Sequence, residues 1–115
     1  MPPTIPTEAD AERRRIVTAL GQLGFVLPGT ISTRMARCGK RSCRCRGEPP
    51  QLHGPYIQWT RAVKGKTVTK TLSKAQLAAY QPWFDNNRQL RELTTDLQHL
   101  SLDTIRTLEG WGAES

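Results

Sequence analysis

The sequence predicts an α+β fold with an N-terminal helix, a three-stranded antiparallel sheet that carries a zinc-bound loop, and a long C-terminal helix, either continuous or divided in two. Apolar residues recur at helical spacing near both ends of the chain. Two runs in the middle are rich in β-branched and aromatic residues, as strands are. The 115 residues are enough for one domain. We place it at 7–109, with a flexible arm at 1–6 and a frayed tail at 110–115.

The first predicted helix spans residues 7–24. Thr7 is expected to be its N-cap, and acidic residues follow in the first turn, where they suit the positive end of the helix dipole. Apolar residues around Ile16 recur on one helical face. Gly24 is expected to end the helix as its C-cap.

The predicted sheet lies within residues 29–73, a segment that also contains three cysteines. A first strand is expected at 30–35, where apolar and polar residues alternate. The clearest element is a hairpin whose strands are 56–63 and 66–72. These three strands form the antiparallel sheet of the predicted fold.

The hairpin turn contains Lys64 and Gly65. A two-residue turn and a bulged three-residue loop fit equally well, because lysine is not ideal at the first position of a tight turn. The two-residue turn makes one face of the hairpin apolar with cations at its edge, and the other face polar. Its pairs are Ile57 with Leu72, Trp59 with Lys70, and Arg61 with Val68.

Residues 74–109 form the predicted C-terminal helical segment. Ser73 and Gln76 have the spacing of a capping box at its start. Pro82 either begins a new helix or kinks the first one, and Ser101 offers a cap for a separate last helix. An apolar stripe favours packing on the first helix, with a homodimer through the C-terminal helix as the alternative. The stripe consists of Phe84, Leu90, Leu93, Leu97, Leu100, Ile105 and Leu108.

Three cysteines and one histidine are the candidate ligands of a structural zinc ion: Cys38, Cys43, Cys45 and His53. Zinc binds four such ligands in a tetrahedron, which leaves no open position for a substrate, so we expect no enzyme activity. The basic neighbours are expected to lower the thiol pKa values. Free structural cysteines, an iron–sulfur or redox role, and a fourth ligand other than His53 remain alternatives.

The centre of the chain is strongly basic. Residues 29–74 hold eleven Lys and Arg residues and one acidic residue, Glu48. This asymmetry favours a polyanionic partner such as nucleic acid, with an acidic protein surface as the main competitor. Trp59 is expected in the core. The candidate nucleic-acid-binding residues are Arg34, Arg37, Lys40, Arg41, Arg44, Arg46, Tyr56, Arg61, Lys64, Lys66 and Lys70.

The cysteine motif and the histidine motif after it resemble a family of small bacterial and archaeal proteins known only as a domain of unknown function. The resemblance rests on the segments Cys38-Gly-Lys-Arg-Ser-Cys-Arg-Cys, His53-Gly-Pro-Tyr and Lys64-Gly-Lys-Thr, and it extends over residues 29–95. It implies that the cysteines and the His-Gly-Pro-Tyr segment act as one unit. Members of this family resemble passengers of mobile genetic elements, which implies DNA or a DNA-processing enzyme as the partner.

These features predict a small, basic, zinc-stabilised accessory protein that binds nucleic acid, with DNA favoured over RNA. The alternative is an adaptor or inhibitor that docks on another protein through the basic loop and the C-terminal helix. No apolar run approaches the roughly 20 residues that span a bilayer, and the first residues lack the pattern of a secretory signal. We therefore expect no membrane partner and a cytoplasmic location.

Overall fold

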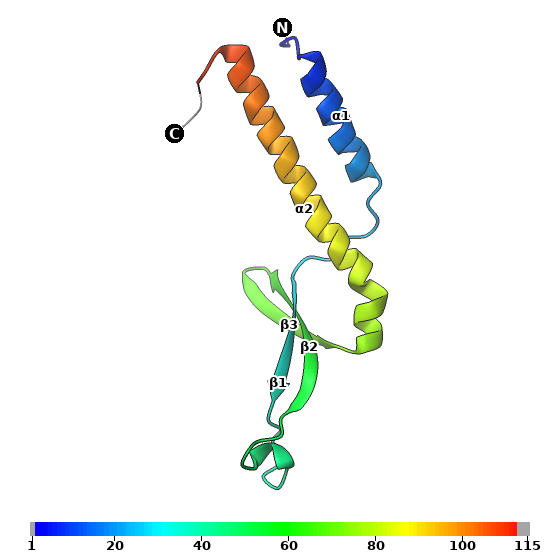
Figure 1. The fold of residues 1–115 in the computed structure, drawn as a ribbon, viewed down its shortest axis with the longest axis vertical. Helices are drawn as coiled ribbons and strands as arrows, with labels where there is room; N and C mark the ends of the chain where they lie inside the picture. The colour runs from blue at the N-terminus through cyan, green and yellow to red at the C-terminus, as the bar shows by residue number, and fades with distance from the viewer. Residues whose placement is uncertain (1, 113–115) are drawn as a thin grey trace. The chain divides into compact units, whose positions relative to one another are not determined.

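Residues 2–112 are described in the computed structural model of the chain (Figure 1). The predicted fold class is confirmed, with an N-terminal helix, a three-stranded antiparallel sheet, a long C-terminal helix and a Cys3His cluster at the loop after the first strand. Residue 1 of the expected arm and residues 113–115 of the expected tail lie outside the described residues. The elements are α1 (Thr7–Gly21), β1 (Thr30–Ala36), the short 3-10 helix η1 (Arg44–Arg46), β2 (His53–Val63), β3 (Lys66–Leu72) and α2 (Lys74–Glu109).

The chain forms two compact units, and the boundary between them lies inside α2. The helical unit comprises Met1–Val26 and Asp85–Ser115, and the sheet unit comprises Leu27–Phe84. The same boundary separates the charges. The sheet unit holds eleven basic residues and one acidic residue, whereas the helical unit holds six basic and nine acidic residues. The basic centre of the sequence is therefore one structural unit.

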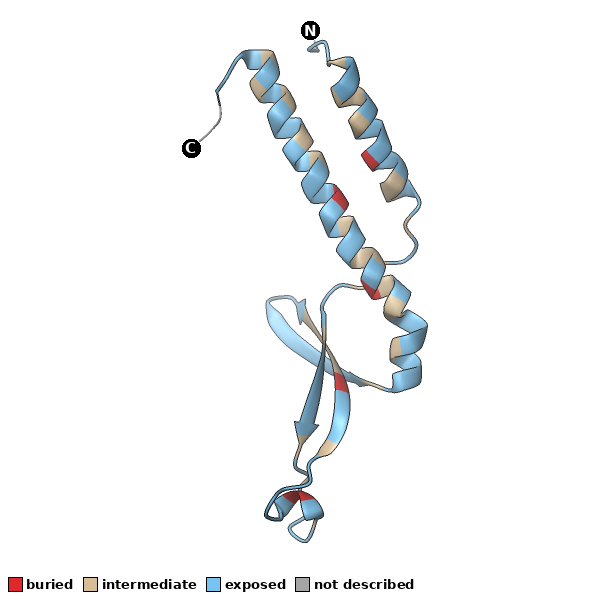
Figure 2. Ribbon diagram, in the orientation of Figure 1, coloured by how far each residue is buried: buried red, intermediate tan, exposed pale blue. Residues whose placement is uncertain are grey.

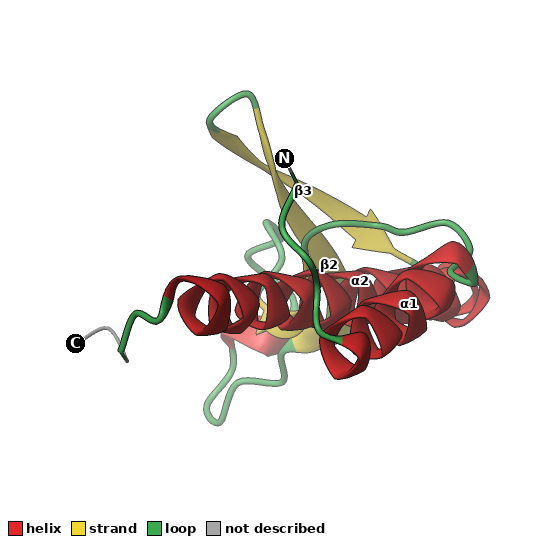
Figure 3. Ribbon diagram, turned by 90° about the horizontal axis from the view of Figure 1, so that it is seen from above, coloured by secondary structure: helices red, strands yellow, loops and turns green. Residues whose placement is uncertain are grey.

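In the helical unit, α1 runs antiparallel to the C-terminal part of α2 (Figures 1 and 3). Ile16 on α1 and Leu93 on α2 are 1% and 8% exposed, and they are the buried side chains among the described residues of this unit (Figure 2). Leu97 and Leu100 line a groove together with residues of α1. The apolar stripe therefore packs towards α1 around Leu93, whereas Ile105 of the same stripe is 43% exposed and is not part of the core.

Both predicted caps of α1 are wrong. Pro6 is the N-cap residue, and its carbonyl accepts a backbone hydrogen bond of 3.0 Å from the first turn, while Thr7 is already helical. Proline suits this position because its fixed φ, here −56°, leads into a helix. At the other end, the N–H of Gln22 donates to the Ala19 carbonyl at 3.2 Å, so the helix closes before Gly24 is reached.

The sheet has the order β1-β2-β3, and both pairs of strands are antiparallel. The hairpin turn has two residues, with φ of 50° at Lys64 and 79° at Gly65. Two positive φ values in succession are the geometry of the tight turns that match strand twist, so the bulged alternative is excluded. The predicted register is confirmed, with Ile57 opposite Leu72, Trp59 opposite Lys70 and Arg61 opposite Val68.

Trp59 organises the apolar side of the sheet unit. Its ring meets the ring of Phe84 edge-on, with centroids 5.5 Å apart, and its indole N–H donates to the Pro28 carbonyl at 2.8 Å. The Arg61 guanidinium lies over the Trp59 ring at 4.4 Å from the centroid, a cation–π contact. Ile57 is 8% exposed on the same face. Trp59 is therefore a packing residue, as expected.

Helix α2 is continuous from Lys74 to Glu109, so the predicted long helix is confirmed and the alternative of a division in two is excluded. Pro82 lies inside the helix and begins no new one. Ser101 caps nothing, because its hydroxyl donates to the Leu97 carbonyl one turn earlier, at 2.8 Å. No helix among the described residues combines the length and the apolar character that crossing a membrane requires.

The capping box at the start of α2 is confirmed and gives a first testable prediction. The Ser73 hydroxyl accepts the Gln76 N–H at 3.0 Å, and the Gln76 side chain accepts the Ser73 N–H at 2.9 Å. We expect Ser73→Ala to lower the free energy of unfolding by about 1 kcal/mol, measured by urea denaturation. The control Ser101→Ala should change it by less than about 0.5 kcal/mol, and equal effects of both variants would contradict the prediction.

Candidate metal centre

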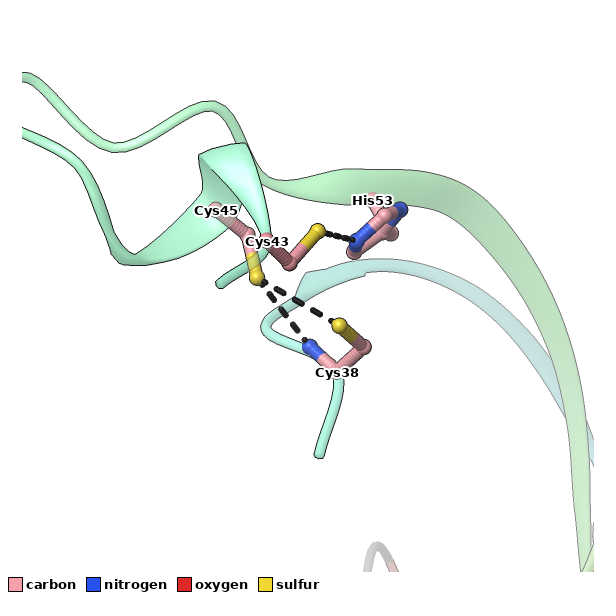
Figure 4. A group of neighbouring side chains, drawn as sticks. All are labelled: Cys38, Cys43, Cys45 and His53. Atoms are coloured by element: carbon pink, nitrogen blue, oxygen red, sulfur yellow. Dashed lines mark hydrogen bonds between the residues drawn. The ribbon is translucent and has the colours of Figure 1, made fainter. Parts of the chain in front are cut away.

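Four potential metal ligands converge where β1 ends and β2 begins (Figure 4). Cys38 follows β1, Cys43 and Cys45 lie at the short helix η1, and His53 is the first residue of β2. The three sulfurs and a ring nitrogen of His53 all lie within 4.8 Å of one another. We call residues 37–52, between the two strands, the metal loop. The structure thus brings together all four ligands that the sequence predicts.

The separations fit a tetrahedral ion. Two thiolates bonded to one zinc ion at about 2.3 Å lie about 3.8 Å apart, and the sulfurs of Cys38 and Cys45 are 3.7 Å apart. The Cys43 sulfur lies 2.9 Å from Nε2 of His53, at hydrogen-bonding distance. A movement of less than about 1 Å would bring this second pair to a tetrahedral spacing. The donor set and its geometry are therefore consistent with a metal site.

Gly54 shapes the entry into β2. The pairing of β1 with β2 is irregular between Arg34 and Ala36, just before the last pair, which joins Ala36 to His53. Gly54 has a φ of 127°, a region that favours glycine, and a Cβ there would lie 2.8 Å from the Arg34 carbonyl oxygen. Glycine therefore lets the strands approach closely beside the cluster, with His53 held at its edge.

Hydrogen bonds order the metal loop around the cluster. Cys45 is fully buried, and its sulfur accepts the backbone N–H of Cys38 at 3.3 Å. The Arg46 guanidinium donates to the Cys38 carbonyl at 2.8 Å. The Arg44 carbonyl accepts the N–H groups of Gly47 and Gln51, at 3.1 and 3.2 Å. Such outer contacts orient the ligands of a metal and limit their movement.

The thiols of Cys43 and Cys38 differ in acidity. The backbone N–H of Cys45, followed by the imidazole of His53 and the Cys38 thiol, lowers the pKa of Cys43 to about 6. At Cys38 the backbone N–H of Lys40 favours the thiolate, but the neighbouring sulfurs and burial outweigh it, so the pKa of Cys38 is raised. Cys43 is therefore largely thiolate at neutral pH, the form that binds metals. These hydrogen bonds, rather than the expected basic side chains, lower its pKa.

Four cations of the metal loop surround the cluster, and we call them the loop cations: Lys40, Arg41, Arg44 and Arg46. All four are exposed. Within residues 2–112, none of them forms an ion pair, because every such pair lies in α1 or α2. Arg46 has a structural contact through the Cys38 carbonyl, so the other three are the more available charges.

The remaining candidate nucleic-acid-binding residues do not share one face of the sheet. Arg34 lies opposite Tyr56 on the polar face, and Tyr56 is 39% exposed. Arg61 and Lys70 lie on the apolar face, together with Lys66. Arg37 is exposed at the start of the metal loop, and Lys64 lies in the hairpin turn. The metal loop is thus where the largest group of predicted cations gathers.

Sequence reasoning did not find two contacts of these arginines. Arg61 stacks on Trp59, and Arg46 holds the Cys38 carbonyl. The contact of Arg61 with Trp59 could have been predicted from the sequence, since residues two apart in a strand lie on the same face. The contact of Arg46 could not, because it depends on how the metal loop folds back on itself.

One family model covers most of the described fold and the whole cluster. A domain of unknown function, DUF6788, matches residues 7–82 of the chain. The chain belongs to the DUF6788 family. No curated protein and no solved structure matches it.

The DUF6788 match contains all four cluster residues and nearly all of the sheet unit. It also contains α1, which the sequence resemblance left outside, and it ends within α2 rather than at residue 95. The DUF6788 description states no activity. The functional argument therefore rests on the cluster and on the charges around it.

Proposed function

We propose that the protein is a small zinc-stabilised accessory protein that binds DNA through its metal loop. The observation that carries this proposal is the position of the loop cations, which are exposed around the Cys3His cluster and form no ion pair within the described residues. A metal that fixes the loop would also fix these charges in space. Preorganised charges bind a polyanion with a smaller loss of conformational entropy than mobile ones.

Zinc suits the cluster better than other common metals. Three thiolates and an imidazole are ligands of zinc, whereas magnesium and calcium take oxygen ligands. Cys38, Cys43, Cys45 and His53 would hold the ion with all four positions filled by the protein. An ion held in this way stabilises the fold and offers no position for a substrate. We therefore propose a binding protein and not an enzyme.

Nucleic acid suits the charge of the sheet unit. Each phosphate that a Lys or Arg neutralises releases condensed counterions, which makes binding favourable and dependent on salt. The sheet unit holds eleven basic residues and a single acidic residue, Glu48, so little of its positive charge is neutralised within the unit. An acidic protein surface is the competing partner, and the experiment below separates the two.

The proposal predicts DNA binding that weakens steeply with salt. If four phosphates are contacted, affinity for a duplex should fall about a hundredfold between about 50 and about 200 mM salt. The double variant Arg41→Gln/Arg44→Gln should bind more weakly and should reduce the salt slope by about two. Fluorescence anisotropy of a labelled duplex, titrated with the zinc-loaded protein, measures both quantities.

The matched control is Arg13→Gln/Arg15→Gln, which removes the same charge from α1. Arg13 is paired with Asp10 and Arg15 with Glu12, so these charges are already compensated locally. The control should leave the salt slope unchanged. Absence of binding at low salt would overturn the proposal and favour a protein partner, and so would an equal loss of affinity in both double variants.

A further inference from the structure

The helical unit leaves large apolar side chains exposed beside its small core. Ile5, Val17, Leu102 and Ile105 are 44%, 45%, 45% and 43% exposed. At 100° per residue, Val17 follows the buried Ile16 by about 100°, and Ile105 lies about 120° around α2 from the buried Leu93. Val17 and Ile105 therefore flank the buried sides of their helices, whereas Leu102 lies about 180° from Leu93, on the opposite side of α2.

A groove places Ile5 and Ile105 on the same side of the helix pair. It has a volume of about 300 Å³, and its apolar lining includes Ile5 and Ile105 together with Leu97, Leu100 and Leu108. Arg13 also lines it and lies one turn from Val17 along α1. We call Ile5, Val17, Ile105 and this groove the lateral face.

Two helices alone give the unit an incomplete core. Among its described residues, only Ile16 and Leu93 are buried. Helical bundles close when each helix packs against two neighbours, as in four-helix bundles. A pair of helices lacks this second layer, and a second pair placed on the lateral face would supply it.

The size of the lateral face favours another copy of the chain, and the charge of the helical unit argues against a polyanion. The unit holds six basic and nine acidic residues, and its ion pairs are local, such as Arg13 with Asp10. A polyanion is therefore drawn to the sheet unit instead. Residues 85–109 of α2 extend over about 37 Å and the 15 residues of α1 over about 22 Å, and each helix is about 10 Å wide. The face of the helix pair therefore measures about 600 Å², somewhat below the roughly 800 Å² that each partner of a stable complex buries.

We propose that two copies of the chain associate through their lateral faces to form a four-helix bundle. The same patch meets itself across a two-fold axis, so no second complementary surface is needed. The groove is lined by Leu97 and Leu100, so this surface includes the part of the apolar stripe that α1 leaves open. The inference goes beyond the proposed function, because it requires neither metal nor nucleic acid at the interface.

The test is the molar mass of the full-length zinc-loaded protein in solution without DNA, measured by analytical ultracentrifugation across a concentration series. A dimer has twice the chain mass of 12.9 kDa. We expect Val17→Glu and Ile105→Glu, made separately, to raise the dissociation constant at least about a hundredfold, because each would bury a carboxylate. Both side chains are already more than 40% exposed, so circular dichroism should show unchanged helix content.

The matched control is Val63→Glu, at a valine of the sheet unit that is 38% exposed. It should leave the dimer intact. A wild-type protein that stays monomeric at about 100 µM, far above the Kd of a stable dimer, overturns the proposal. A dimer that survives both helical variants, or one that the control also dissociates, overturns the lateral face as the interface.

Discussion

Replacing Cys45 by serine is expected to remove the metal from the protein and to unfold the metal loop. Cys45 is fully buried, and its sulfur contacts both the sulfur and the backbone N–H of Cys38. A structural zinc site contributes its binding energy to folding, so we expect Cys45→Ser to lower the free energy of unfolding by more than about 4 kcal/mol. Elemental analysis should show about one zinc per chain in the wild type and almost none in the variant.

Two controls make this prediction specific to the metal. After treatment with a chelator, the wild type and Cys45→Ser should unfold at similar urea concentrations. The reason is that the stability which the variant loses comes from the bound ion. The two histidines form a matched pair: His53→Ala should lower metal affinity at least tenfold, whereas His99→Ala, on the exposed side of α2, should not. A wild type that never contains metal contradicts the prediction.

Replacing Gly54 by alanine is expected to have the second-largest effect. The added Cβ would lie 2.8 Å from the Arg34 carbonyl oxygen and 3.0 Å from the Tyr56 nitrogen, and the φ of 127° is strained for alanine. We expect the free energy of unfolding to fall by about 2–4 kcal/mol. Metal affinity should fall as well, because the ligand His53 is the preceding residue. Urea denaturation and zinc titration measure the two effects.

Gly21→Ala is the matched control for this substitution. Gly21 ends α1, and a Cβ there would meet no atom within 4 Å. Alanine has the higher helix propensity, so this variant should be as stable as the wild type or more stable by up to about 1 kcal/mol. If Gly54→Ala were equally harmless, β1 and β2 would not need the close approach that the structure shows.

Local pattern was enough to predict the hairpin and the start of α2, but it was not enough to predict the ends of α1 or to show that α2 is continuous. Strand alternation and a two-residue turn fix the pairing of Trp59 with Lys70. The continuity of α2 through Pro82 depends on more distant contacts. Phe84, two residues later, is 8% exposed and packs on Trp59, so tertiary packing holds the helix across the hydrogen bond that proline lacks.

The candidate metal site was largely predictable, because thiols and an imidazole in a short loop have few common roles. Its supporting contacts were not predictable, since the hydrogen bond from Arg46 to the Cys38 carbonyl depends on the path of the metal loop. The face of the sheet on which Arg34 lies could not be predicted from the sequence either. It depends on the register between β1 and β2, and the long connection between these strands does not fix that register as a tight turn would.

The positions of the tryptophans give the sheet unit a fluorescence signal of its own. Trp59 and Trp83 belong to the sheet unit, and Trp59 is held among Phe84, Pro28 and Arg61. Trp111, beyond α2, is 54% exposed, so its emission is already close to that of a residue in water. Intrinsic fluorescence therefore reports mainly melting of the sheet unit, whereas far-ultraviolet circular dichroism reports mainly α1 and α2, most of whose residues belong to the helical unit. Coincident curves from the two probes would identify one cooperative transition, and separate curves would resolve the units in solution.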